Sequence, residues 1–350
     1  MRGTLLTVFA LVLLWTSAFA GPKSGDLSGN LVIFHAGSLA VPFDEIAKAF
    51  MREHPKVKVI REAAGSRTCA RKIADLGRPC DVMASADYTV IDTLLIPNYA
   101  SWDIKFASNE MVIAYNAASQ LSDRINRENW FEILLDKRAR FGRSNPNSDP
   151  CGYRSVMTMK LAEKFYNKPG LAKELLMKDL RFMRPKETDL LALLESHVID
   201  YVFIYRSVAK QHGLKHVLLP DEINLKQASL AGRYSTVSVS VSGKRPGETI
   251  TKRGAPMVYG VTIPKTARNP EAALAFVEFL LERDKGMAIM EKNGQPSVVP
   301  SPTATYNKLP AQLRRFAVPG QASRADNKPA RKPSTGPQRS QHEEGAGNKK

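Results

Sequence analysis

The sequence has few cysteines and no motif typical of nucleotide or zinc enzymes. Its 350 residues include three cysteines, too few for a scaffold built on disulfides. Neither G-x-x-x-x-G-K-[ST] nor G-x-G-x-x-G occurs, and the six histidines show no spacing such as H-E-x-x-H. No apolar run reaches the roughly 20 residues that cross a bilayer. These absences argue against a disulfide-rich, nucleotide-binding, zinc-dependent or membrane-spanning protein.

The N-terminus predicts export. Residues 1–20 contain Arg2, an apolar stretch from Leu5 to Trp15 and the ending Ala18-Phe19-Ala20, the pattern of a cleaved signal peptide. An uncleaved anchor would need a longer apolar run. No cysteine follows that would carry a lipid. We therefore expect a soluble protein secreted to the periplasm or the extracellular space.

The chain is strongly basic, with 51 Lys and Arg against 34 Asp and Glu, a net charge of +17. Such a charge often indicates nucleic-acid binding, but an exported protein meets little nucleic acid. Small anions or an anionic membrane face suit this charge better. Residues 321–350 are rich in Lys, Arg, Pro and Ser, so we expect a disordered basic tail there.

Short apolar runs alternate with helical patterns along the chain. A strand is expected at 31–34, followed by a helix with Phe43, Ile46, Ala47 and Phe50 on one face that ends before Pro55. Further strands are expected at 57–60, 81–84, 111–115, 201–205 and 258–263, with an antiparallel piece within 234–253. This order predicts an α/β fold with a largely parallel sheet.

Three loops follow expected strands and precede helices, where α/β proteins bind ligands. They are Ala36-Gly37-Ser38, Ala64-Gly65-Ser66 and Asp149-Pro150-Cys151-Gly152. Glycine admits a ligand close to the backbone, serine adds a hydroxyl donor, and a helix start attracts anions. The alternative is that Ser38 and Ser66 only cap helices, and Ser66 in particular is expected to be an N-cap.

The cysteines allow two further hypotheses. Cys151 lies near an expected helix start, which would lower its thiol pKa, and with a histidine it would serve as a nucleophile. A structural thiol is the simpler interpretation. Cys69 and Cys80 could form a disulfide in an oxidising compartment, which the sequence leaves open.

Several stretches together resemble the substrate-binding proteins of ABC importers for molybdate and tungstate, in particular the archaeal-type branch. The stretches include Phe34-His35-Ala36-Gly37-Ser38-Leu39, Ala64-Gly65-Ser66, 81–88, Asp149-Pro150-Cys151-Gly152-Tyr153-Arg154-Ser155, 200–209, 219–225 and 258–264. The stretch that begins at Asp149 is the most specific of them.

The resemblance implies a two-lobed periplasmic-binding-protein fold, type II-like, in which each lobe has a mixed, mostly parallel sheet flanked by helices. Lobe one would comprise 27–108 and 259–318, and lobe two 109–258. A ligand would bind in the cleft, and hinge closure would bury it.

The resemblance also implies the ligand-binding residues. Ser38, Ser66 and the loop with Cys151 and Gly152 would hold an oxyanion, and Tyr205 would be a further donor. Asp149 and Glu187 would each approach the molybdenum or tungsten centre as a metal ligand. Asp189 competes with Glu187 for this assignment. On the simpler interpretation, Asp149 caps a helix and Glu187 lies in a solvated first turn.

These observations predict a binding protein, not an enzyme, that delivers tungstate or molybdate to the membrane permease of an ABC importer. The expected partners are the oxyanion and the permease, without nucleic acid or cofactor, and the protein is expected to be a monomer. Sulfate, phosphate, ferric iron and small carboxylates are rival ligands. An exported hydrolase that uses Cys151 is the alternative from another functional class.

Overall fold

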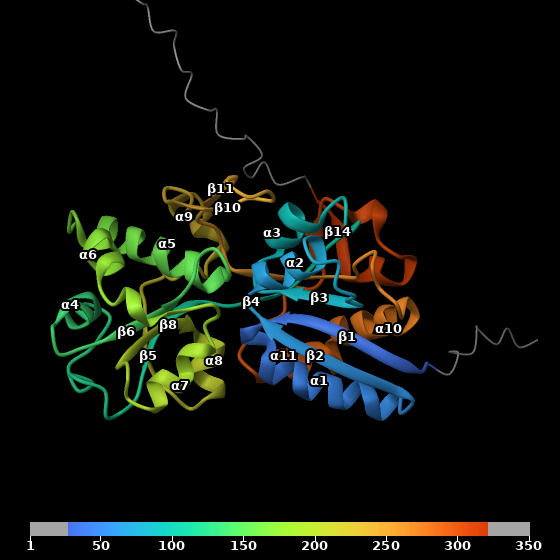
Figure 1. Ribbon diagram of the computed structural model, residues 1–350, viewed down its shortest axis with the longest axis horizontal. Coiled ribbons are helices and arrows are strands. Elements are labelled where there is room, and N and C mark those ends of the chain that lie inside the picture. Colours follow the sequence, from blue (N-terminus) through green and yellow to red (C-terminus); the bar gives the residue numbers. More distant parts are fainter. Residues whose placement is uncertain (1–26, 321–350) are drawn as a thin grey trace, which may run out of the picture.

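The computed structural model describes residues 27–320, which form two lobes, each built on one five-stranded sheet (Figure 1). The expected signal peptide at 1–20 and the expected tail at 321–350 lie outside the described residues. Within 27–320, no helix is both long and apolar enough to cross a membrane.

The first sheet has the strand order β2-β1-β3-β12-β4. Helices α1 and α10 and the short helices α2, α3 and α11 surround it (Figure 1). A pair of short strands, β13 and β14, completes this lobe. The bounds are β1 Gly29–Ala36, α1 Ala40–Glu53, β2 Val57–Ala64, α2 Ser66–Ala74, β3 Val82–Ser85, α3 Tyr88–Val90, β4 Ile104–Ser108, β12 Val258–Thr262, α10 Pro270–Leu281, α11 Ala288–Lys292, β13 Ser301–Thr303 and β14 Ala317–Pro319.

The second sheet has the order β7-β6-β8-β5-β9, with α5 as its longest helix. The antiparallel hairpin of β10 and β11 matches the piece expected within 234–253. The bounds are β5 Met111–Tyr115, α4 Trp130–Leu135, β6 Phe141–Ser144, α5 Pro150–Phe165, α6 Leu171–Met177, β7 Met183–Arg184, α7 Asp189–Glu195, β8 Tyr201–Tyr205, α8 Arg206–Gln211, β9 Lys215–Leu218, α9 Ala231–Tyr234, β10 Ser238–Ser242 and β11 Thr249–Arg253.

The periplasmic-binding-protein fold with mixed sheets is confirmed, but parallel pairs do not predominate. In the first sheet β1 pairs in parallel with β2 and β3, whereas β12 is antiparallel to both β3 and β4. In the second sheet β6 pairs in parallel with β7 and β8, whereas β5 is antiparallel to both β8 and β9. Because β5 and β12 receive the chain from the other lobe, they run against the strands of the β-α-β units.

Local sequence explains the first β-α-β unit. Helix α1 buries Phe43, Ile46, Ala47 and Phe50, the face that the sequence predicts, and it ends at Glu53, two residues before Pro55. Helix α1 packs against β1 and β2, so the Gly37-Ser38 turn is held at the carboxyl end of β1. This end of the strand faces the second lobe.

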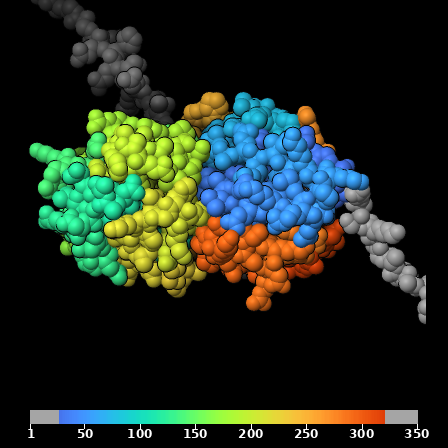
Figure 2. Space-filling model, turned by 90° about the horizontal axis from the view of Figure 1, so that it is seen from below, coloured from blue at the N-terminus to red at the C-terminus, as the bar shows by residue number. Residues whose placement is uncertain are grey.

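The chain passes between the sheets at residues 109–110 and returns at 254–257. The lobes meet along a seam, with the yellow and green second lobe against the blue and orange first lobe (Figure 2). In the seam, the carbonyl of Ser148 accepts hydrogen bonds from the backbone N–H groups of Arg67 and Thr68. The predicted lobe boundaries stay a prediction.

Candidate functional site

The Gly37 and Gly65 turns of the first lobe lie directly against two carboxyl-bearing segments of the second. A Cβ placed on Gly37 would lie 3.0 Å from Glu187 Oε2 and 2.9 Å from Thr188 Oγ1. A Cβ on Gly65 would lie 2.4 Å from the carbonyl oxygen of Ser148 and 3.1 Å from Asp149 Cβ. Glycine is required at both turns because each backbone approaches the other lobe this closely. The structure therefore brings together three of the segments singled out in the sequence.

Ser38 and Ser66 are buried, and neither side chain caps a helix. The prediction that Ser66 is an N-cap is wrong: Gly65 is the N-cap residue, and Ser66 is the first residue of α2. Ser66 Oγ instead accepts a hydrogen bond of 3.0 Å from the backbone N–H of Ala86, at the end of β3. The alternative in which both serines act only as caps is therefore wrong.

The Ser38 hydroxyl is held by residues from the segments that connect the lobes. Ser38 Oγ accepts a 3.0 Å hydrogen bond from the hydroxyl of Tyr259, on β12. The Tyr259 hydroxyl in turn accepts a 2.9 Å bond from Asn109 Nδ2, in the other crossing segment. Since Tyr259 gives its proton to Ser38, the hydroxyl proton of Ser38 is available for a ligand.

Tyr205, in the second lobe, also has a hydroxyl oxygen that accepts a hydrogen bond from the protein. It lies at the end of β8 and is fully buried, and burial raises its pKa well above the ordinary value. Its hydroxyl accepts a 3.0 Å hydrogen bond from Arg154 Nη1. Its ring lies 6.3 Å from that of Tyr259, which places it near Ser38. Thus Ser38, Ser66 and Tyr205 each accept a hydrogen bond from the protein and each keep a proton to donate.

Asp149 is the N-cap of α5, and it also reaches the start of α7. Its Oδ1 accepts from the backbone N–H of Cys151 at 3.4 Å, and its Oδ2 accepts from the N–H of Glu187 at 3.1 Å. The capping interpretation is therefore confirmed. Capping leaves lone pairs on both oxygens for a further contact. Burial raises the pKa of this carboxyl.

Glu187 is completely buried, and its carboxyl oxygens make no well-formed hydrogen bond within residues 27–320, although the Asp149 carboxyl and the Ser38 backbone lie beside them. The interpretation as a solvated first turn is therefore wrong. Burial raises its pKa well above the ordinary value, and the neighbouring Asp149 carboxyl raises it further. A buried carboxyl without well-formed hydrogen bonds is costly, so this group calls for a ligand or a proton.

Asp189, two residues later, has a different environment. It is partly exposed, and its Oδ1 lies 2.8 Å from Lys186 Nζ, in an ion pair near the start of α7. Of the two candidates, only Glu187 lies against Gly37 and beside Asp149.

Cys151 and Gly152 face away from the lobe interface. The Cys151 thiol is buried and lies 3.6 Å from the carbonyl oxygen of Phe203, in the second sheet. The predicted lowering of its pKa is wrong: burial, together with Asp149 and Glu187, raises the pKa well above the ordinary value. Gly152 packs against residues 144–146, and its N–H bonds to the carbonyl of Asp149. Cys69 and Cys80 are free, so the disulfide hypothesis is wrong.

Several residues of the lobe interface carry no sequence signal of their role. Asp87 accepts a hydrogen bond from the Tyr153 hydroxyl of the other lobe, and Arg154 Nη1 donates to the carbonyl of Ala86 at 2.7 Å. Asp87, Tyr153 and Arg154 all lie in the stretches that carry the resemblance. Only their contacts across the seam reveal what they do.

Known proteins resemble this chain along most of its length. Residues 31–295 match the family model described as bacterial extracellular solute-binding protein. An uncharacterized solute-binding protein of Petrotoga mobilis is 52% identical over 84% of this chain and 92% of its own. The molybdate/tungstate-binding protein WtpA of Pyrococcus abyssi is 41% identical over 89% of this chain and 97% of its own.

Among solved structures, the periplasmic molybdate-binding protein of Azotobacter vinelandii shares the fold, with a TM-score of 0.56 and 17% identity over 76% of this chain and 98% of that one. At this identity the likeness shows the architecture alone. The family model and the relatives show more: the chain belongs to the extracellular solute-binding protein family and is a binding protein, not an enzyme.

Proposed function

We propose that the protein captures tungstate or molybdate between its lobes and delivers it to the membrane permease of an ABC importer. The observation that carries the proposal is Glu187, whose carboxyl is fully buried at the lobe interface and makes no well-formed hydrogen bond within residues 27–320. It lies beside Asp149 and against the Gly37 turn.

The donor set suits an oxyanion. Ser38, Ser66 and Tyr205 all have hydroxyl protons to give, because their oxygens accept hydrogen bonds from Tyr259, Ala86 and Arg154. A tetrahedral oxyanion offers acceptors in several directions at once. A ligand that needs acceptors from the protein has less use for these three groups.

Two ionised carboxylates beside a doubly charged anion would repel it unless they coordinate its central atom. Molybdenum and tungsten in their hexavalent state accept additional oxygen ligands beyond four, whereas sulfur in sulfate does not. Asp149 and Glu187 would then supply one oxygen each to the metal centre. This assignment favours tungstate and molybdate over sulfate and phosphate, and it agrees with the similarity to the molybdate/tungstate-binding protein of Pyrococcus abyssi.

The cell location and assembly remain part of this proposal. Secretion through a cleaved signal peptide and a periplasmic or extracellular location are supported by the N-terminal pattern and by the family match. The monomeric state is proposed with them.

Calorimetric titration with tungstate, molybdate, sulfate and phosphate in turn tests the proposed ligand. We expect tight binding of one tungstate or molybdate per chain and much weaker binding of the other two anions. Tight binding of sulfate or phosphate, with no heat from tungstate and molybdate, would overturn the proposal.

A further inference from the structure

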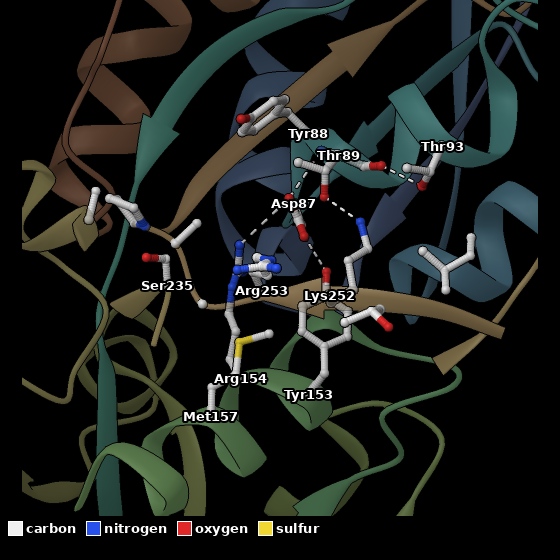
Figure 3. Close-up of a pocket in the computed structure, with 16 residues that line it drawn as sticks. Asp87, Tyr88, Thr89, Thr93, Tyr153, Arg154, Met157, Ser235, Lys252 and Arg253 are labelled. Carbon is white, nitrogen blue, oxygen red and sulfur yellow. Dashed lines mark hydrogen bonds and ion pairs between the residues drawn. The ribbon is translucent and has the colours of Figure 1, made fainter. Parts of the chain in front are cut away.

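A cavity lies between the lobes, beside the proposed oxyanion site (Figure 3). Its volume is about 450 Å³. The first lobe contributes Asp87, Tyr88, Thr89 and Thr93, and the second lobe contributes residues of α5, α9 and the stretch 250–256. Among the described residues that line it, none is Ser38, Ser66, Asp149, Glu187 or Tyr205. The cavity is therefore a separate space.

Arg154 lies between this cavity and the proposed oxyanion site. One of its guanidinium nitrogens, Nη1, donates to the carbonyl of Ala86 and to the hydroxyl of Tyr205. Its other terminal nitrogen, Nη2, lies 4.0 Å from Asp87 Oδ1 and faces the cavity (Figure 3). The same residue thus contacts the oxyanion site through Tyr205 and lines the cavity.

Positive charge exceeds negative charge around the cavity. Two buried cations, Arg154 and Lys252, line it against one carboxylate, Asp87. Although burial opposes ionisation, Lys252 and Arg154 hold the pKa of Asp87 below its ordinary value, so Asp87 is charged. Lys252 is buried, and its Nζ donates one of its three N–H groups to Thr89 Oγ1 at 2.5 Å. Buried cations in excess favour an anion beside them.

The rest of the lining combines hydroxyl-bearing and apolar side chains. Met157, Ala231, Ile250, Ala255 and Pro256 supply side chains that offer nothing to a bare inorganic ion. An occupant with a hydrocarbon body gains from burial against them.

We propose that this cavity binds a small organic anion. Its carboxylate, sulfonate or phosphate group lies beside Lys252, and its apolar body lies against Met157 and Ile250. This inference goes beyond the proposed function, because the occupant is neither tungstate nor molybdate. Since both lobes supply the walls, the occupant stabilises the closed arrangement. It therefore couples positively to the oxyanion, and the coupling is reciprocal.

The probe for the test is anilinonaphthalene sulfonate, an aromatic anion whose fluorescence rises in apolar surroundings. We expect one sulfonate per chain, bound several-fold more tightly by tungstate-loaded protein than by ligand-free protein. N-phenylnaphthylamine, which has the same body without the charge, should bind at least about tenfold more weakly. Equal binding of the charged and the neutral probe would overturn the proposal.

Variants locate the site. Lys252→Met should weaken sulfonate binding about tenfold, whereas Lys58→Met, on the exposed side of edge strand β2, should leave it unchanged. Ser235→Trp places a large side chain at an exposed position in the lining and should block the cavity without disturbing the core. Wild-type binding in both Lys252→Met and Ser235→Trp would refute the assignment. The comparison of these variants with Lys58→Met stands even if tungstate proves not to be the ligand.

Discussion

Asp149 Oδ2 accepts a 3.1 Å hydrogen bond from the backbone N–H of Glu187, a residue 38 positions later in the chain. This bond ties the N-cap of α5 to the segment before α7, so the two carboxyls keep a fixed relation within the second lobe. Gly37 and Gly65, the neighbours of Ser38 and Ser66, belong to the first lobe and lie against the segments of Glu187 and Asp149. In the proposed function, ligand capture is the closing of these serines over a preformed carboxyl pair.

Removal of the Glu187 carboxyl should reduce selectivity. Glu187→Gln keeps the shape but loses a strong metal ligand, so we expect tungstate affinity to fall at least about tenfold, or about 1.4 kcal/mol. Sulfate affinity should stay the same or rise, because sulfur takes no further oxygen ligand and gains nothing from this carboxyl. Asp189→Asn is the matched control, since Asp189 pairs with Lys186 and should leave both affinities unchanged. Calorimetry with both anions measures this, and unchanged selectivity in Glu187→Gln would show that the carboxyl is structural.

The buried carboxyl pair should make the ligand-free protein less stable as pH rises. The pKa values of Asp149 and Glu187 are raised in the folded state, so the folded protein holds protons that the unfolded chain releases above about pH 4. Stability from these groups is therefore present at low pH and is lost as pH rises above that value. Urea unfolding between about pH 5 and about pH 8 should show this decline, and Glu187→Gln should flatten it. Parallel curves for wild type and Glu187→Gln would contradict the raised pKa.

Tyr259 should act on the ligand through Ser38. Tyr259→Phe removes the hydroxyl that donates to Ser38 Oγ and leaves the serine free to rotate. We expect all oxyanions to bind about fivefold more weakly, the loss of one hydrogen bond of about 1 kcal/mol. Tyr201→Phe is the control, because the Tyr201 hydroxyl donates to the carbonyl of Gln120, far from the lobe interface. If the two variants lose affinity equally, the relay through Ser38 is wrong.

Closure should be sensitive to one methyl group at Gly65. The Cβ of Gly65→Ala would lie 2.4 Å from the Ser148 carbonyl oxygen, on the opposite lobe, so the variant should fold normally but fail to close. We expect tungstate affinity to fall by more than about tenfold, with little change in the melting temperature of the ligand-free protein. Gly232→Ala, whose Cβ would meet no atom within 4 Å, is the matched control. Scattering that shows the same compaction with tungstate in both variants would count against this contact.

Much of the fold follows from local pattern. The apolar spacing of Phe43, Ile46 and Phe50 defines the buried face of α1, and the Asp149-Pro150 pair starts α5 where an N-cap is expected. These features depend on neighbours within one or two turns, so the sequence alone predicts them. The antiparallel pairing of β12 with β3 joins strands far apart in the chain and could not be predicted in this way.

The features of the candidate site also separate into those that local sequence predicts and those that depend on tertiary packing. The sequence by itself determined which loops carry glycine, serine and aspartate, because the position of a loop after an expected strand or before an expected helix is a local feature of the chain. Only the tertiary structure distinguishes the surroundings of Glu187 from those of Asp189, since residues two apart near the start of one short helix differ in what packs over them. Gly37 of the other lobe covers Glu187, whereas Lys186 pairs with Asp189. Likewise, the burial of Cys151 and the contacts of Tyr259 and Arg154 depend on packing between distant segments, which no local pattern encodes.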